Sequence, residues 1–140
     1  MRAVVQRVER AAVRVDGRTV AEIGTGLLIL LGVAEEDDEA VADRLAAKLL
    51  ALRVFEDAEG RMNVDVAAAS GALLCVSNFT VYGDTRRGNR PSFTRAARPE
   101  RAEELYERVR ERLGAQGGVF GARMAVDLVN DGPVTLVVDA

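Results

Sequence analysis

The segment Ser77-Asn78-Phe79-Thr80 places two hydroxyls and one amide at the polar end of an apolar run. At such a strand end, side-chain oxygens and free backbone N–H groups can face a cleft together. Ser77 or Thr80 could act as a nucleophile, but neither hydroxyl has a visible activator. The alternative is that these hydroxyls only satisfy backbone groups. If the segment is catalytic, backbone donors that stabilise a developing oxyanion are favoured, because they require no titrating side chain.

The stretch from Asp84 to Arg101 concentrates positive charge. Its six arginines face only two acidic residues, so its net charge is +4 while the rest of the chain carries −7. Phe79, Tyr82 and Phe93 flank it or lie within it. Arginine beside aromatic rings suits phosphates and an unpaired base, which indicates contact with a nucleotide or nucleic acid. The alternative is that these arginines only reflect a chain that uses Arg almost to the exclusion of Lys.

The segment Asn130-Asp131-Gly132-Pro133 separates two apolar runs. Asp-Gly between strands is typical of a hairpin turn, and a following Pro can end that turn. The alternative is a cis Gly132-Pro133 peptide bond, a form that about 5% of X-Pro bonds adopt in folded proteins. A cis bond would place two carbonyl groups side by side, where they could accept hydrogen bonds from an ammonium group.

The residue types that the chain lacks exclude several chemistries. Among its 140 residues there is no His and only one Cys. Without an imidazole there is no Ser-His-Asp or Cys-His hydrolase site, and a zinc site of Cys and His cannot be built. Cys75 lies in a short apolar run of buried-strand type with no nearby base or cation, which predicts an inert core thiol.

The apolar runs favour a cytoplasmic protein. Charges interrupt the first ten residues, unlike the apolar region of a secretory signal. The longest apolar run, 27–33, is far shorter than the roughly 20 residues needed to cross a bilayer. A single cysteine agrees with a reducing compartment. We therefore expect no membrane partner.

One domain over residues 1–140 is expected, because 49% of the residues are hydrophobic and no linker or repeat divides the chain. Helical spacing predicts helices from Asp38 to about Leu52, behind an acidic run interpreted as a solvated helix start, and from Pro99 to Leu113. The predicted fold class is α/β, with a mainly antiparallel, curved sheet that forms a partial barrel and two helices packed on it. Strands are predicted over 2–15, 19–23, 27–33, 53–55, 61–66, 72–82, 123–129 and 134–138.

Taken in order, the motifs of the chain resemble those of the D-aminoacyl-tRNA deacylase family over nearly the whole length. The family has Ser-Gln-Phe-Thr where this chain has Ser77-Asn78-Phe79-Thr80, so Asn78 keeps the amide on a side chain one methylene shorter. The other matching segments are Ala3–Val8, Gly24–Leu28, Phe55–Asp57, Gly60–Asn63, Gly88–Phe93 and Leu128–Thr135.

The resemblance implies hydrolysis of the ester between a D-amino acid, or glycine, and the terminal adenosine of tRNA, as chiral proofreading in translation. It implies a homodimer in which Gly132-Pro133 of one subunit, with a cis bond, enters the active site of the other and rejects L-amino acids. It implies no metal, no cofactor and no DNA partner.

The resemblance also implies roles for single residues. Ser77, Asn78, Phe79 and Thr80 form the catalytic segment, where backbone N–H groups around Phe79 and Thr80 bind the oxyanion and Thr80 has a positioning role. The 2′-hydroxyl of the adenosine is expected to help activate water. The other implied roles are adenine contact for Phe79 and Phe93, phosphate contact for Arg86, Arg87 and Arg90, and a place near the pocket for Arg7.

Two other functions fit part of this pattern. A non-catalytic dimer that binds a tRNA end or a nucleotide would keep the arginine-rich loop and lack turnover. A relaxed deacylase that clears another mischarged tRNA is suggested by the shortened side chain of Asn78. Hydrolysis assays with D-tyrosyl-, L-tyrosyl- and glycyl-tRNA separate these functions.

Overall fold

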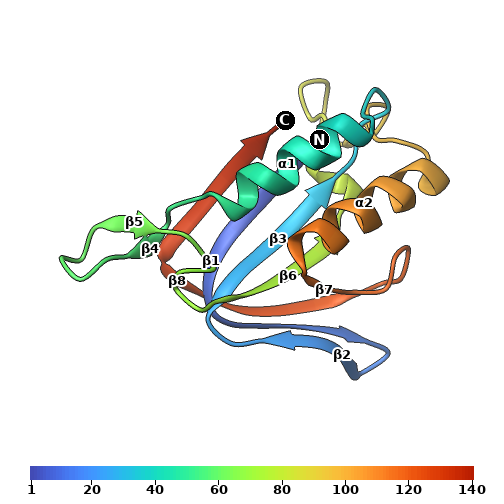
Figure 1. Cartoon of the computed structure of the whole chain (residues 1–140). Helices are drawn as coiled ribbons and strands as arrows, with labels where there is room; N and C mark the ends of the chain where they lie inside the picture. The colour runs from blue at the N-terminus through green and yellow to red at the C-terminus, as the bar shows by residue number, and fades with distance from the viewer.

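The sheet is organised around one long strand. In the computed structural model, which describes residues 1–140, β1 (Arg2–Val15) pairs antiparallel with β2 (Arg18–Ile23), β3 (Gly26–Gly32) and β8 (Ala125–Asp139). β3 is parallel to β6 (Ala72–Ser77), which is parallel to the short β7 (Gln116–Gly117). Figure 1 shows that the sheet is strongly curved. The predicted fold class, a mainly antiparallel partial barrel with two helices, is confirmed.

Both helices lie together on one side of the sheet (Figure 1). α1 (Glu39–Leu50) begins after Asp38, whose carboxylate accepts a hydrogen bond from the Val41 N–H at 2.9 Å. α2 (Pro99–Leu113) has Pro in its first turn and ends at Gly114 with a φ of 61°. A core cluster of 23 buried residues joins the helices to the sheet, and a second cluster of 8 covers the other side. Neither helix has the length and apolar character needed to span a bilayer.

A small hairpin projects from the sheet beside β8 (Figure 1). It consists of β4 (Phe55–Glu56) and β5 (Met62–Val64), which are shorter than the predicted strands 53–55 and 61–66. The Asp57 carboxylate accepts hydrogen bonds from the N–H groups of Glu59 and Arg61, and these bonds shape the intervening turn.

The predicted strand 72–82 is wrong in its second half. β6 ends at Ser77, and residues Phe79–Tyr82 form a 3₁₀ turn, η1. Alternation of apolar residues continues through this segment, so the local pattern still resembles a strand. Its partner β3 ends at Gly32, however, and without a neighbouring strand to pair with, the chain turns.

The predicted hairpin between strands 123–129 and 134–138 is also wrong. Both runs belong to β8, which pairs with β1 from Asp139 opposite Arg2 to Ala125 opposite Arg14. Because β1 is long enough to pair with both runs, the residues between them bulge outward, and β8 bends sharply along its length (Figure 1). The Gly132-Pro133 bond in this bulge is cis, as the resemblance implied.

Candidate active site

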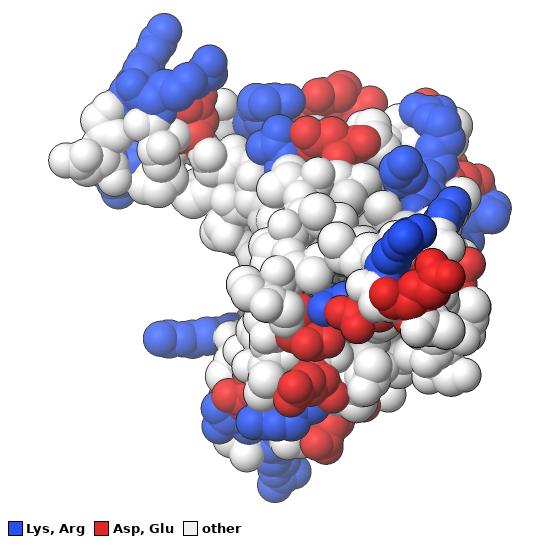
Figure 2. Space-filling model, turned by 90° about the vertical axis from the view of Figure 1, so that its left-hand side faces the viewer, with Lys and Arg blue, Asp and Glu red and all other residues white.

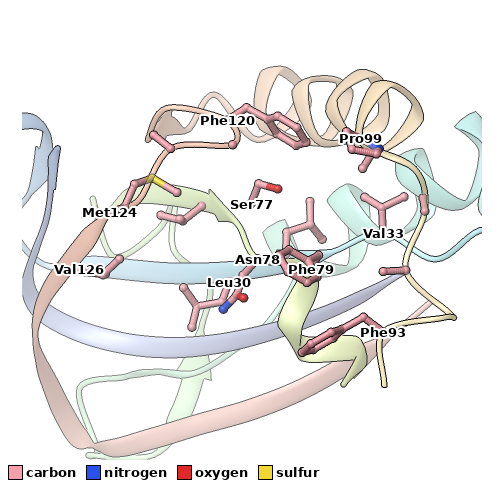
Figure 3. Close-up of a pocket in the computed structure, with 17 residues that line it drawn as sticks. Leu30, Val33, Ser77, Asn78, Phe79, Phe93, Pro99, Phe120, Met124 and Val126 are labelled. Carbon is pink, nitrogen blue, oxygen red and sulfur yellow. The ribbon is translucent and has the colours of Figure 1, made fainter. Parts of the chain in front are cut away.

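An apolar cavity of about 620 Å³ opens at the carboxyl ends of the parallel strands β3 and β6. Its volume lies in the range of small-ligand sites, about 300–1,000 Å³. Ser77 and Asn78 line the cavity where β6 ends, and Pro99 and Ala102 line it from α2. Figure 3 shows the Ser77 hydroxyl inside a ring of apolar side chains. The strand ends therefore deliver a few polar groups to a predominantly apolar site.

The turn η1 contains main-chain donors next to the polar end of this cavity, which Asn78 and Phe79 line and Thr80 does not. The Asn78 N–H makes the last bond to β3, donating to the Leu31 carbonyl at 2.8 Å. The N–H groups of Phe79 and Thr80 open the following turn and have no acceptor within the chain. Two adjacent, unpaired amides of this kind can stabilise negative charge that develops on a carbonyl oxygen.

Gly32 permits η1 to lie directly on β3. A Cβ atom at this position would collide with Cγ2 of Val81 and lie 3.0 Å from Cδ2 of Tyr82. The Tyr82 ring is buried behind the turn, with the guanidinium groups of Arg2 and Arg95 each 5.4 Å from its centre. Burial raises the pKa of Tyr82 to about 12, so the phenol is neutral and serves as packing.

The hydroxyl of Thr80 is held by its neighbour and has no base beside it. It donates to Oδ1 of Asn78 at 2.5 Å. The shortened amide of Asn78 therefore orients Thr80, while the Ser77 hydroxyl makes no hydrogen bond within the chain. These contacts show no activated nucleophile among the three side chains.

Two aromatic rings stand at the rim of the cavity. Phe79 and Phe93 meet edge to face, with ring centres 5.0 Å apart and planes at 76°. Both are unusually exposed for phenylalanine, with exposed fractions of 55% and 36%. Exposed rings at the mouth of an apolar cavity can stack against a planar ligand such as a nucleobase.

No ionisable side chain lines the cavity. The structure also contains no group of three or more His, Cys, Asp or Glu side chains arranged to hold a metal ion. Cys75 lies fully buried in β6, where burial raises its pKa to about 12, in agreement with the prediction of an inert core thiol.

The basic loop lies next to the rim, and its arginines differ in their contacts. Arg86 is held by Asp84, with Nη2 2.6 Å from Oδ2, and this contact lowers the pKa of the Asp84 carboxyl to about 2. Arg87 and Arg90 are exposed and make no ion pair. Figure 2 shows basic side chains on lobes that border a hollow of uncharged atoms. Of the three predicted phosphate contacts, only Arg87 and Arg90 are thus free.

Arg7 and Gly132-Pro133 lie together, but they do not line the cavity of their own chain. Arg7 is buried, donates to the Val54 carbonyl at 2.7 Å and approaches Asp131 to 3.1 Å. Gly132 has a φ of 118°, and a Cβ there would lie 3.1 Å from Nη2 of Arg7. Arg7 therefore contacts the base of the bulge, and its expected place near the pocket of an assembled dimer stays a prediction.

Sequence reasoning missed one wall of the cavity. Phe120, Gly121, Ala122 and Met124 come from the loop that follows β7, and Phe120 packs on Tyr106 of α2 with ring centres 6.0 Å apart. Figure 3 shows Phe120 and Met124 across the cavity from Phe79. The Gly-rich loop 117–121 was a visible signal, but nothing local indicated which site it would face.

Fold and site together define a class of protein. It is a single α/β unit with a predominantly apolar cavity at its strand ends and two main-chain N–H groups without an acceptor in the adjacent turn. The family model described as D-Tyr-tRNA(Tyr) deacylase matches residues 4–139. The chain therefore belongs to the D-Tyr-tRNA(Tyr) deacylase family, which confirms the resemblance found in its motifs.

Similar proteins agree with this assignment. A protein from Symbiobacterium thermophilum named D-aminoacyl-tRNA deacylase is 59% identical, with 100% of this chain and 96% of that protein covered. A protein of the same name from Escherichia coli is 54% identical, with 96% of this chain and 97% of that protein covered.

Two solved structures are similar over almost the entire chain. One, titled c-Myc DNA Unwinding Element Binding Protein, has a TM-score of 0.95 and 40% identity, and the match covers 100% of this chain and 99% of that one. A probable eukaryotic D-amino acid tRNA deacylase has a TM-score of 0.85 at 16% identity, with 99% and 98% covered, and shows the shared fold.

Proposed function

We propose that this protein hydrolyses the ester bond of D-aminoacyl-tRNA, and of glycyl-tRNA, and releases the free amino acid and reusable tRNA. Membership of the family supports the reaction class. The observation that carries the proposal is the pair of unpaired N–H groups on Phe79, which lines a cavity with no ionisable side chain, and on its neighbour Thr80. An aminoacyl ester is already reactive, so a positioned oxyanion site can suffice for its hydrolysis.

The proposed reaction uses the main chain and the substrate itself. The ester carbonyl oxygen lies against the N–H groups of Phe79 and Thr80 while water attacks the carbonyl carbon. The adenosine 2′-hydroxyl accepts a proton from this water and passes its own proton to the 3′-oxygen, which leaves as a hydroxyl when the ester bond breaks. Ser77 and the Asn78–Thr80 pair position these groups, and Phe79 and Phe93 contact the adenine.

Chiral selection is proposed to need a second copy of the chain. Gly132-Pro133 does not line the cavity of its own subunit; it is exposed, and Arg7 pairs with the preceding Asp131. In a homodimer this segment would enter the partner's cavity, where its backbone would collide with an L side chain. The exposed Leu136 and Val137 on the same strand, 37% and 64% accessible, support a contact surface there.

The proposed reaction requires no metal or cofactor, because the main chain and the substrate supply its groups. The tRNA substrate, which presents its aminoacylated 3′ end, implies a cytoplasmic protein. Incubation with a chelator is therefore expected to leave the rate unchanged, and a rate restored only by an added divalent ion would contradict this part of the proposal.

The decisive experiment compares three substrates. Purified protein is incubated with D-tyrosyl-tRNA, L-tyrosyl-tRNA and glycyl-tRNA, and ester loss is followed against spontaneous hydrolysis. We expect loss of the D-tyrosyl and glycyl esters and retention of the L-tyrosyl ester. No loss above background from any of the three would reject the enzymatic function.

Two alternative functions predict other outcomes of this assay. A relaxed deacylase, suggested by the shortened Asn78, would also hydrolyse the L-tyrosyl ester. A non-catalytic nucleic-acid-binding protein would bind uncharged tRNA without turnover. One similar structure is titled as a DNA-binding protein, so a single-stranded DNA of the same 3′ sequence serves as the comparison ligand.

A further inference from the structure

One short segment separates the apolar cavity from a second, entirely polar hollow. The side chains of Ser92, Phe93 and Thr94, at the start of a turn closed by the Ala96 N–H on the Phe93 carbonyl at 3.1 Å, line different spaces. Phe93 lines the apolar cavity, whereas Ser92 and Thr94 line a hollow of about 430 Å³ together with Asp84, Arg86 and Arg87. The two spaces therefore share a wall one residue thick, with a ring on one side and hydroxyls and guanidinium groups on the other.

The floor of the polar hollow is fixed by hydrogen bonds. The N–H of Asp84 donates to the Ser92 carbonyl at 2.8 Å, and the Ser92 N–H donates back to the Asp84 carbonyl at 2.9 Å. The Arg86 N–H and its guanidinium both donate to the Asp84 carboxylate, at 3.0 Å and 2.6–3.1 Å. Asp84 and Arg86 thus neutralise each other and hold the loop that carries Arg87.

The remaining groups of the hollow suit one phosphodiester. Arg87 is exposed, makes no ion pair and supplies an uncompensated positive charge. Ser92 and Thr94 add two hydroxyls on the same side, whose only mutual contact is a long one of 3.5 Å. A guanidinium with neighbouring hydroxyl donors is a typical phosphate-binding set, and no carboxylate here remains free to repel an anion.

We propose that Arg87, Ser92 and Thr94 bind the phosphodiester on the 5′ side of the nucleoside that occupies the apolar cavity. This inference rests on the proposed function, because it takes that nucleoside to be the terminal adenosine of an aminoacylated RNA. The RNA strand then passes over the Ser92–Thr94 segment at Phe93, with the adenosine on one side of this segment and its 5′ phosphate on the other. Arg86 is a positioning residue that acts through Asp84.

The test compares two small substrates that differ only in the phosphate. One is D-tyrosyl-adenosine, and the other is D-tyrosyl-adenosine that carries a 5′-methylphosphate, a monoanion like the natural diester. We expect the phosphate to raise kcat/KM of the wild-type protein about tenfold, as one charge-assisted contact would. In Arg87→Gln, the ratio of kcat/KM with the phosphate to kcat/KM without it should fall from about ten to between about one and two. In Ser92→Ala the same ratio should fall less.

Arg18→Gln is the matched control, because Arg18 is equally exposed, makes no ion pair and lies on β2 outside both hollows. This variant should keep the tenfold gain in kcat/KM that the phosphate gives. If it lost that gain to the same extent as Arg87→Gln, the effect would be one of overall charge and the phosphate site would be rejected. With tRNA, Arg87→Gln should reduce the slope of log kcat/KM against log salt by about 0.7, the value for one single-strand phosphate.

The outcomes separate this inference from the proposed function. If neither small substrate nor D-tyrosyl-tRNA is hydrolysed, the proposed function fails. If D-tyrosyl-tRNA is hydrolysed and the phosphate gives no gain in the wild-type protein, or Arg87→Gln keeps the full gain, the phosphate site is overturned while the deacylase function stands.

Discussion

Thr80 illustrates how the contacts of one residue decide between two chemical roles. Its hydroxyl donates to Asn78 and has no imidazole, lysine or carboxylate beside it. A serine or threonine nucleophile needs such a base to lose its proton. Its backbone N–H, by contrast, has no acceptor within the chain and lies at the start of η1, next to Phe79 of the cavity lining. We therefore propose that the Thr80 side chain positions the reacting groups and that its main-chain N–H stabilises the oxyanion.

Thr80→Ala is expected to keep substantial activity on D-tyrosyl-tRNA. The substitution removes the hydrogen bond to Asn78 but leaves both N–H donors, so a loss of about fivefold in kcat is expected, as for one hydrogen bond of about 1 kcal/mol. Single-turnover kinetics measure this loss. A loss of about 10⁴-fold or more with an unchanged circular dichroism spectrum would restore Thr80 as the nucleophile.

The pH dependence follows from the lack of ionisable groups in the cavity. Among the nearby groups, Tyr82 and Asp84 have pKa values of about 12 and about 2, so the phenol stays neutral and the carboxylate stays charged in between. We expect kcat from pH 5 to pH 9, corrected for spontaneous hydrolysis, to follow only the substrate α-ammonium, whose ordinary pKa is about 8. A bell-shaped profile with two ionisations would show that an enzyme side chain takes part.

At the scale of elements, the site depends on where β6 stops and how closely η1 approaches β3. The strand ends because β3 offers no further partner, and Gly32 leaves room for Val81 against it. The predicted strand 72–82 ran through the candidate segment Ser77–Thr80, because strand length depends on a distant partner rather than on local alternation.

Gly32→Ala should displace η1 and its two donors. Its Cβ would collide with Val81, and because the neighbouring strand cannot move, the turn must shift. A misplacement of roughly 1 Å can lower a rate about 10²-fold, so a drop of this order in kcat is expected. Gly24→Ala is the control, since its Cβ meets nothing within 4 Å and kcat should stay unchanged.

Circular dichroism and thermal unfolding establish whether the Gly32→Ala protein is folded. A folded variant with wild-type kcat would contradict the dependence of the donors on this contact. Should the variant fail to fold, Val81→Ala combined with Gly32→Ala removes the Cγ2 atom that the new Cβ would strike and should restore folding.

At the scale of the whole molecule, the cavity and the Gly132-Pro133 bulge lie apart within one chain, so the proposed selection depends on assembly. Light scattering is expected to give a mass of about twice 15.0 kDa at micromolar concentration. A monomer that still rejects the L-tyrosyl ester would contradict selection by a partner subunit.

Gly132→Ala should weaken this selection. The residue has a φ of 118°, and its Cβ would press on Arg7 and Val134, so the bulge must move. We expect the ratio of L- to D-tyrosyl-tRNA hydrolysis to rise at least about tenfold. Gly60→Ala, which has a similar positive φ of 78° but lies in the turn between β4 and β5 with open space around it, should leave that ratio unchanged.

The sequence by itself determined the features that depend on local pattern. Both helices begin and end close to the predicted residues, because caps and spacing act within a few residues of each other. The absent histidine and the charge of the arginine loop likewise needed no structure. The residue types of Ser77–Thr80 left a catalytic and a purely structural role open, and the resemblance to the family assigned the catalytic role, which stays a prediction.

Only the tertiary structure decided what depends on distant partners. β1 converted a predicted hairpin into one bulged strand, and the loop after β7 became a wall of the cavity. Asp84 distinguished Arg86, which is paired, from Arg87, which is free. Strand ends, cavity walls and ion pairs are contacts between segments far apart in the chain, and local sequence does not specify which segments will meet.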